Sequence, residues 1–275
     1  MLTLLLAILA MPLAAPTTAA PAGSSWKTLA GGLEMRVMDG GTLCRKGSRE
    51  IVVVRARPKS WRLDLFLDSE GGGEREPKDI DAWQRATGAP VIINAGQYYP
   101  DRTPMGLFIK QGRNLGTKML KPWKGILAAE PSDTRAPSAV ILDLEHDSFD
   151  AATTPYRVVL QSFMLLDREG KKRVRRSDWH ANRTVVATDR SGRLLIVRTE
   201  GAYTLWELAD WLHTSGLGVT QAMSLDGGFE SQICVRAGGV EYLSFGRWSV
   251  DDRGDRSLDG VRARLPAAVG LFPRK

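Results

Sequence analysis

The chain has 275 residues, of which 43% are hydrophobic and 25% are charged. This balance is typical of a globular protein with a sizeable core, and it excludes a disordered, collagen-like or coiled-coil chain. Two cysteines and three histidines are too few for a disulfide-stapled mini-fold or a structural zinc cluster. The net charge of +7 and the isoelectric point near 9.6 indicate an anionic neighbour without saying which.

The first residues of the chain are predicted to be an export signal. Residues 2–15 carry no charge and are nearly all apolar, but this run is shorter than the ~20 residues of a membrane-spanning helix, and Pro12 interrupts it. Small residues follow, and residues 18–20 (TAA) offer a cleavage site. Because the usual basic residues before the apolar run are missing, an uncleaved apolar anchor or a misassigned start codon is the alternative.

These features divide the chain into three parts. We expect a signal peptide over residues 1–20, a flexible lead with the first strand over residues 21–48, and the functional domain over residues 49–275. The mature protein would then be periplasmic or extracellular, with no stable membrane insertion after cleavage. In such an oxidising compartment Cys44 and Cys234 can form a disulfide, and two buried free thiols are the equal alternative.

Strand patterns dominate the domain. Residues 51–57 (IVVVRAR) and 61–67 (WRLDLFL) are apolar or alternate, and the Pro-Lys-Ser turn between them predicts a hairpin. Further strands are expected at residues 90–94, 106–110, 139–145, 157–161, 184–188, 194–199 and 221–225.

Two helices are predicted from periodicity and from their ends. Residues 79–87 form a short helix that Gly88 ends, and residues 205–215 repeat apolar residues at helical spacing before Gly216. Strands outnumber helices, their order is mixed, and no repeat or linker divides the domain. We therefore expect a single α+β domain with a mixed, strand-rich central sheet flanked by helices.

Polar segments at strand ends are the candidates for chemistry. In residues 92–101 an apolar strand ends in Asn94 and Gly96, which places an amide beside exposed backbone. A simple turn with Gly96 at positive φ is the alternative. Arg183, at the start of another strand, can bind a phosphate or carboxylate through two parallel hydrogen bonds, or it can pair with a neighbouring carboxylate at the rim.

A third segment centres on Asp226, which follows a buried strand and precedes Gly227 and Gly228. A carboxylate at a strand end, beside bare backbone N–H groups, suits an acid, a base, a nucleophile or a metal ligand. An Asp-Gly hairpin turn explains the same residues equally well. No ligand spacing demands a metal, so no cofactor is expected, and a divalent cation beside the carboxylate is the alternative.

Together these segments resemble the phosphodiester glycosidase family, which includes the lysosomal uncovering enzyme. The family's N-A-G-x-Y element, Q-S segment, R-T strand, T-L-x-E-L-A helix and L-D-G-G turn are similar to residues 94–98, 161–162, 183–184, 204–209 and 225–228. Five elements in this order, over roughly residues 91–234, make the resemblance specific. The chain departs from the family where a proline is absent after Gln161 and where Phe229 and Glu230 replace small residues.

The resemblance implies an exported hydrolase that cleaves the glycosidic bond of sugar-1-phosphate diesters in envelope or extracellular glycans. Asp226 would act as nucleophile or base, Arg183 would neutralise the departing phosphate, and Glu230 is the candidate for a second carboxylate. The predicted substrate-binding residues are Asn94, Gly96, Thr184, Gly227 and Gly228.

Other features have simpler interpretations. Glu207 is a further carboxylate near these motifs, but Thr204 three residues earlier predicts a capping box. Residues 171–176 hold five basic residues in six. Without interleaved aromatics this run does not predict nucleic-acid binding, and a solvated hairpin tip or a site for anionic envelope polymers are the two interpretations.

Trp123 and Trp179 are either sugar-stacking or packing residues. A non-catalytic carbohydrate-binding or envelope-organising relative of the same fold is the alternative function.

Overall fold

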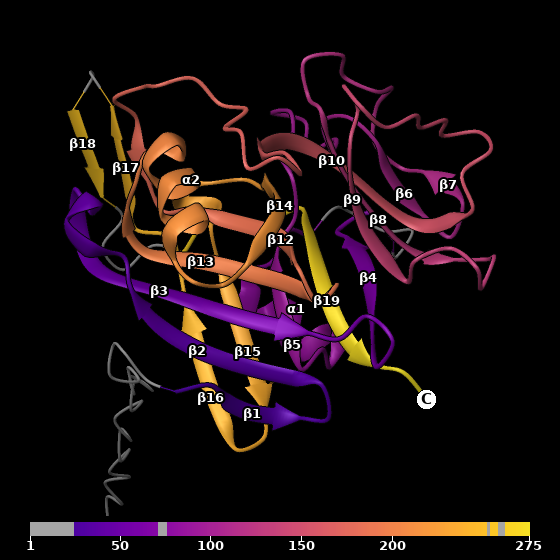
Figure 1. Ribbon diagram of the computed structural model, residues 1–275, viewed down its shortest axis with the longest axis horizontal. Coiled ribbons are helices and arrows are strands. Elements are labelled where there is room, and N and C mark those ends of the chain that lie inside the picture. The colour runs from indigo at the N-terminus through magenta and orange to yellow at the C-terminus, as the bar shows by residue number, and fades with distance from the viewer. Residues whose placement is uncertain (1–24, 71–75, 252–253, 258–261) are drawn as a thin grey trace, which may run out of the picture.

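The computed structural model describes residues 25–70, 76–251, 254–257 and 262–275 (Figure 1). The predicted signal peptide, residues 1–20, lies outside the described residues. Strands build most of the domain, and its two α-helices have only 8 and 10 residues. Every strand pair among the described residues is antiparallel. The expected α+β class with a mixed sheet was therefore wrong. The fold is mainly β, because apolar runs distant in sequence pair with one another and few segments have a helical period.

The largest sheet has eleven strands. Its main path runs through β1 (Lys27–Ala30), β2 (Leu33–Asp39), β3 (Lys46–Ala56), β13 (Leu194–Ala202), β12 (Thr184–Asp189), β14 (Val219–Ser224), β10 (Tyr156–Leu166), β6 (Phe108–Lys110) and β7 (Arg113–Asn114). Beside this path, β8 (Gly125–Pro131) pairs with β10, and β9 (Ala139–Asp143) pairs with β8. The first two strands, which come from the expected N-terminal lead, are thus part of the sheet that contains β12 and β14.

Two smaller sheets complete the fold. The five-stranded sheet has the order β16 (Val240–Ser244), β15 (Ile233–Ala237), β5 (Val91–Asn94), β19 (Ala267–Pro273) and β4 (Trp61–Leu67). The three-stranded sheet has the order β11 (His180–Ala181), β17 (Trp248–Asp251) and β18 (Gly254–Ser257). Two 3₁₀ turns, η1 (Gly41–Leu43) and η2 (Gly228–Glu230), lie between strands.

The predicted hairpin of residues 51–57 and 61–67 is wrong, although both segments are strands. β3 pairs with β2 and β13 in the large sheet, whereas β4 pairs with β19 in the five-stranded sheet. The short turn after β3 therefore carries the chain from one sheet to the other. Proximity in sequence favours a hairpin, but the buried residues of both strands, such as Val54 and Leu65, belong to one core cluster between the two sheets.

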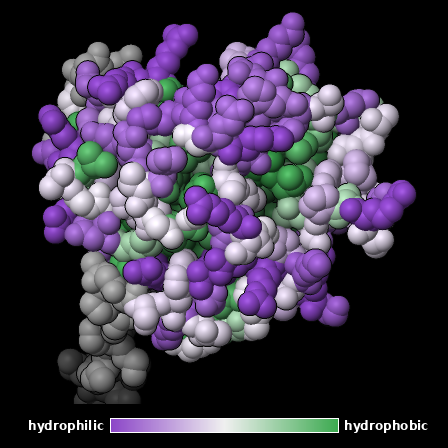
Figure 2. All heavy atoms as spheres, viewed as in Figure 1, coloured by the Kyte–Doolittle hydropathy of each residue, from purple (hydrophilic) through white to green (hydrophobic). Residues whose placement is uncertain are grey.

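The main hydrophobic core lies between the two larger sheets. It includes Val54 of β3 and Met223 of β14 from one sheet, and Leu65 of β4 and Ile93 of β5 from the other. The two cysteines lie apart from this core and from each other, and both are free thiols, Cys44 partly exposed and Cys234 buried. Hydrophilic side chains cover most of the face in Figure 2, and apolar atoms show in scattered patches.

Each helix covers the outer face of one sheet. α1 (Ile80–Thr87) packs on the five-stranded sheet and ends at Gly88, as predicted, with φ of 67° at that glycine. Asp79, expected as the first residue of this helix, is its N-terminal cap. α2 (Leu205–Thr214) packs on the large sheet and lies in front of β12 and β13 in Figure 1. No helix among the described residues is long and apolar enough to cross a membrane.

Candidate active site

Three strand ends that were predicted to carry chemistry meet at one edge of the molecule. β12 and β14 are antiparallel neighbours, so the start of β12 lies beside the end of β14. Arg183 directly precedes β12, and Asp226 follows the last residue of β14 by two positions. β5 of the opposite sheet ends there too, because Asn94 Nδ2 donates to the main-chain oxygen of Asp226 at 2.9 Å. The candidate site thus lies where the two sheets meet. The hairpin interpretation of the Asp-Gly segment is wrong, since the strands on either side of it belong to different sheets.

Asn94 joins the two sheets with its side-chain amide. Its Oδ1 accepts hydrogen bonds from Thr184 Oγ1 at 2.7 Å and from the Gln232 N–H at 3.1 Å. Its Nδ2 donates to the carbonyls of Ala95 and Asp226. Asn94 and Thr184 are 1% and 0% exposed. In this arrangement both side chains hold the strand ends in place.

Asp226 places its carboxyl group at the centre of this edge. The Gly227 N–H donates to Asp226 Oδ1 at 3.0 Å. Burial, and next the charge of Glu230, raises the pKa of Asp226 to about 7, although the Gly227 N–H and the Arg183 charge act in the opposite direction. At neutral pH the group is therefore divided between its acid and carboxylate forms, and it can exchange a proton in this pH range.

Glu230 is the second carboxyl group at the edge. Tyr98 Oη donates to Glu230 Oε1 at 3.4 Å. Burial raises the pKa of Glu230, and the hydrogen bond from Tyr98 partly opposes that rise. Burial and the charges of Glu230 and Asp226 raise the pKa of Tyr98 as well, so the phenol keeps its proton and stays a donor. The site therefore holds two interacting carboxyl groups and one phenol.

Arg183 is buried beside these carboxyl groups, and it contacts main-chain carbonyls. Its Nε donates to Tyr203 O at 2.9 Å, and its Nη2 donates to Trp179 O at 2.7 Å. Within the part of the chain that the structure describes, Nη1 makes no hydrogen bond and the guanidinium makes no ion pair. Burial lowers the pKa of Arg183 to about 10, although Asp226 and Glu207 raise it, so the side chain stays charged at neutral pH. A charged donor is thus left available for an anion.

The glycines of the site allow close approach of main chain and side chain. A Cβ atom at Gly227 would lie 3.0 Å from Asn182 O and 3.2 Å from Arg183 Nη1, so a side chain there would cover the free nitrogen. Gly228 has φ of 69° and donates its N–H to Asn182 O at 2.8 Å. Gly96 is not among the residues of positive φ, which excludes the simple turn that the sequence left open.

The rim beside Arg183 is formed by residues near the start of α2. The predicted capping box is confirmed, because Thr204 Oγ1 accepts from the Glu207 N–H and Glu207 Oε2 accepts from the Thr204 N–H. His180 Nε2 lies 3.4 Å from Glu207 Oε2. Trp179 is 47% exposed with its ring centroid 4.8 Å from Arg183 Cζ, whereas Trp123 is buried. Of these two tryptophans, Trp179 is therefore the one whose ring a sugar can reach.

Metal-ligating side chains gather elsewhere in the fold. Ligand atoms of Asp143, His146 and Asp167 lie within 4.8 Å of one another. Arg173 Nη1 is 2.6 Å from Asp143 Oδ2 and 3.5 Å from Asp167 Oδ2, so a guanidinium already balances these carboxylates. At the site itself, Asp226 and Glu230 are the carboxyl groups that a cation would find.

Sequence reasoning missed the residues that bridge the motifs. Tyr98, in the first motif, was not recognised as the partner of Glu230 in the third. Ser162 of β10 donates to Gln97 Oε1 at 3.2 Å and also contacts Ser224 O. Both contacts join segments that are far apart in sequence, and no local pattern marks them. The one available signal was their position inside or next to the recognised motifs.

Comparison with known proteins agrees with this architecture. A family model for phosphodiester glycosidases matches residues 87–269. The fold is similar to the catalytic domain of zebrafish N-acetylglucosamine-1-phosphodiester alpha-N-acetylglucosaminidase, auto-inhibited by its pro-peptide, with 14% identity over 89% of this chain and 85% of that one and a TM-score of 0.61. It is also similar to a hypothetical protein from Synechocystis, with 15% identity over 88% of this chain and 62% of that one and a TM-score of 0.58.

A comparison with curated proteins finds no match. The identities to the solved structures are low, so those structures support the fold, and the assignment to a family rests on the family model. Its match covers well over half of the chain and includes Asn94, Arg183, Asp226 and Glu230. This chain belongs to the phosphodiester glycosidase family.

Proposed function

We propose that this protein is an exported hydrolase that breaks the bond between a sugar's anomeric carbon and the phosphate oxygen in sugar-1-phosphate diesters of envelope or extracellular glycans. The observation that carries the proposal is that Asp226, with its pKa near 7, and buried Arg183, with its free Nη1, lie at the same edge of the molecule. The apolar stretch at residues 2–15 supports the export part of the proposal.

Arg183 binds the phosphate in this proposal. When the glycosidic bond breaks, its electron pair stays on the phosphate oxygen, and negative charge grows there. A buried guanidinium that is already fixed by two carbonyls stabilises that charge with little reorganisation. The departing phosphomonoester is also a better leaving group than an alcohol, so the demand on a general acid is low.

Asp226 acts in its carboxylate form, as nucleophile or as base. As nucleophile, a carboxylate oxygen bonds to the anomeric carbon while the phosphate leaves, and water later releases the sugar. As base, the carboxylate takes a proton from water while the water oxygen bonds to that carbon. Both routes give free sugar and a phosphomonoester. Both also predict that activity rises as pH passes through about 7, the pKa of Asp226.

Glu230 and Tyr98 complete the proposed machinery. Glu230 is the second carboxyl group, and its negative charge keeps the pKa of Asp226 raised. Tyr98 holds Glu230 in place through the 3.4 Å hydrogen bond. Asn94, Thr184 and the neighbouring glycines position the two carboxyl groups, and Trp179 offers a ring for the sugar at the rim.

The test measures the products that the purified mature protein releases from a panel of sugar-1-phosphate diesters, with and without EDTA. Free sugar from the diesters, with no release from matched aryl glycosides or aryl phosphodiesters, is the expected result. Asp226→Asn should lose about 10³-fold or more in kcat while keeping ligand affinity. Asp178→Asn is the matched control. It makes the same Asp-to-Asn change at an exposed aspartate near the site.

Three results would overturn parts of this proposal. Free sugar 1-phosphate as the product would mean cleavage on the phosphorus side. Full activity of Asp226→Asn would remove that residue from the mechanism. Binding without any turnover would identify a non-catalytic carbohydrate-binding relative.

A further inference from the structure

The basic run at residues 171–176 contains two kinds of side chain. Lys172 pairs with Asp210, and Arg173 pairs with Asp143 at 2.6 Å. The Arg173 N–H also donates to the carbonyl of a β10 residue, which fixes the segment to the large sheet. These two cations are therefore already paired within the fold, and their contacts hold the rest of the run in a defined position.

Arg175 and Arg176 are different, because both are exposed and neither has an ion pair within the described residues. Arg176 Cζ lies 5.0 Å from the ring centroid of Trp206, in the first turn of α2. The chain then reaches Trp179, whose carbonyl accepts a hydrogen bond from Arg183. Two available cations are thus presented close to the arginine that we assign to the phosphate.

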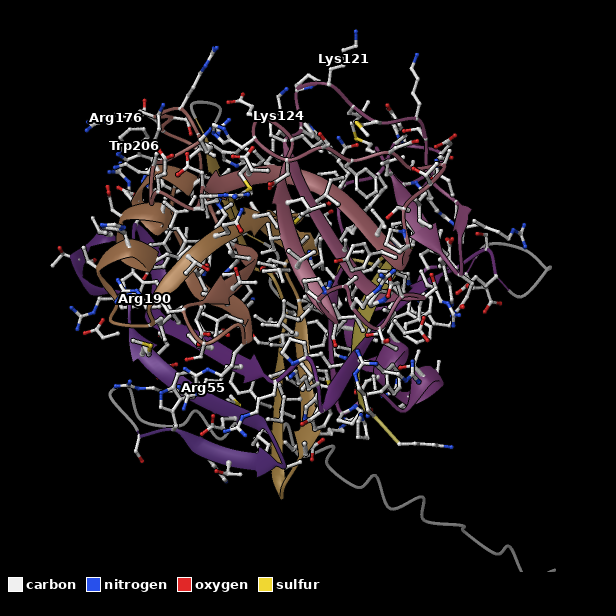
Figure 3. The ribbon with its side chains drawn as sticks, turned by 45° about the vertical axis from the view of Figure 1, so that its right-hand side comes forward. Arg55, Lys121, Lys124, Arg176, Arg190 and Trp206 are labelled. Carbon is white, nitrogen blue, oxygen red and sulfur yellow. The ribbon has the colours of Figure 1, made fainter. Side chains whose placement is uncertain are left out.

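Lys121 and Lys124 approach the same edge from its other side. They flank Trp123, whose ring centroid lies 4.7 Å from that of Phe163. Phe163 is 36% exposed and pairs across β10 and β14 with Ser224, the last residue of β14. In the part of the chain that the structure describes, neither lysine has an ion pair. Figure 3 shows Lys121, Lys124 and Arg176 along the upper edge of the molecule.

We propose that Lys121, Lys124, Arg175 and Arg176 form a basic band that binds a polymer of sugars joined by phosphodiesters. One diester of the polymer would lie in the active site, and phosphates of neighbouring repeats would contact the band. This inference rests on the proposed function and extends it, because it identifies the substrate as a polyanionic chain.

The chemistry of the edge fits alternating sugars and phosphates. The exposed rings of Phe163 and Trp179 offer stacking surfaces for sugars, and the four cations offer donors for phosphates. A single diester carries one phosphate, for which Arg183 suffices, so the band has no partner in a small substrate. Exposed cations around a site also raise the local concentration of a polyanion.

The experiment compares two substrates, a long synthetic polymer of hexoses joined through 1-phosphodiesters and the methyl diester of the same hexose 1-phosphate. Two double variants remove the two halves of the band, Lys121→Gln with Lys124→Gln and Arg175→Gln with Arg176→Gln. Each should raise KM for the polymer about fivefold, since each lost exposed ion pair contributes modestly. KM for the methyl diester should stay within about twofold of wild type, because no band residue contacts it.

The matched control is Lys27→Gln with Lys59→Gln, which removes the same charge. Both lysines are exposed. Lys27 lies on β1 at the far end of the large sheet, and Lys59 follows β3 at the end opposite to the site. This control should behave as wild type on both substrates. Added salt should raise KM for the polymer in wild type more than in the band variants.

The outcomes separate the band from the proposed function. If the band variants match the control on the polymer while wild type cleaves the methyl diester, the band proposal fails and the function stands. If wild type cleaves neither substrate, the function fails, and fluorescence anisotropy of labelled polymer tests the band directly. Weaker polymer binding by the band variants supports it, and unchanged binding overturns it. Displacement of the polymer by single-stranded DNA or by anionic vesicles at equal charge would also overturn it.

Discussion

Arg183, directly before β12, and Arg198, on the neighbouring β13, are both buried, and the protein holds them in opposite ways. Arg198 lies opposite Thr184 in the pairing of β12 with β13. It forms an ion pair with Glu200, and its Nη1 donates to Ser244 Oγ at 2.6 Å. Arg183 instead contacts carbonyl groups and keeps one nitrogen free.

The carboxyl groups near the two arginines show the same contrast. Burial would raise the pKa of Glu200, but the charge and hydrogen bonds of Arg198 outweigh it and hold that pKa below its usual value. Burial dominates at Asp226, where Arg183 acts too weakly to prevent a rise to about 7. A buried cation that is paired cannot be removed without leaving its counterion uncompensated, whereas one without a counterion is suited to bind an anion.

The largest effect on stability is expected from breaking the ion pair between Arg198 and Glu200. Arg198→Met should lower the free energy of unfolding by about 3 to 5 kcal/mol, because it leaves half-buried Glu200 without its cation. Urea unfolding measures this loss. Arg198→Met combined with Glu200→Gln should recover part of it, and no recovery would contradict the assignment of the pair.

Replacing Arg183, which has no ion pair, should reduce activity more than stability. Arg183→Met should lower kcat/KM for a sugar-1-phosphate diester by about 10² to 10³, because a charged donor to the leaving phosphate is lost. Its free energy of unfolding should fall by less than that of Arg198→Met, since hydrogen bonds to two carbonyls are lost but no ion pair is broken. Steady-state kinetics and urea unfolding of the same preparation test both statements. A large loss of stability with normal kcat/KM would make Arg183 a second structural arginine.

Neutralising Asp226 and neutralising Glu200 should change the free energy of unfolding with opposite signs. The pKa of Asp226 is raised on folding, so the folded state binds the proton more tightly, and this contribution to stability is lost as pH rises from about 4 to about 7. Asp226→Asn should therefore stabilise the protein at pH 8 by on the order of 2 to 4 kcal/mol and have little effect at pH 4. Glu200→Gln should destabilise it at pH 8. Urea unfolding at the two pH values measures both, and a pH-independent effect of Asp226→Asn would contradict the raised pKa.

The smallest effect, a shift in the pH profile of kcat/KM, is expected from neutralising Glu230. Glu230→Gln removes a negative charge that raises the pKa of Asp226. The rise of kcat/KM with pH, which reports that pKa, should then move to lower pH. Tyr98→Phe, the milder change, keeps the Glu230 charge and should leave the rise in place. A shift to higher pH in Glu230→Gln would exclude Glu230 as the charge that faces Asp226.

Local features of the structure were predictable from the sequence because their causes are local. The end of the first helix at Gly88 and the capping box at Thr204 depend on residues within one helical turn. The strand positions were also largely correct, since apolar alternation is a property of a few adjacent residues. The spacing of the motifs was enough to identify the family.

Pairing between strands was not predictable in this way. β5 pairs with β15 and β19, more than a hundred residues later in the chain, and nothing in residues 91–94 marks those partners. The same limit produced the incorrect fold class and the incorrect hairpin. A strand's local pattern shows that it has a buried face, but it does not show which strand lies beside it.

The sequence by itself determined the helix ends, most strands, the family and the chain positions of Asp226, Arg183 and Glu230. Only the tertiary structure decided which polar groups are already satisfied and which stay available. Asn94 and Thr184 look like binding residues in the sequence, yet they bond to each other across two sheets. Hydrogen bonds and burial depend on neighbours that are distant in sequence, so which polar side chains stay available to a ligand is decided only when the sheets meet.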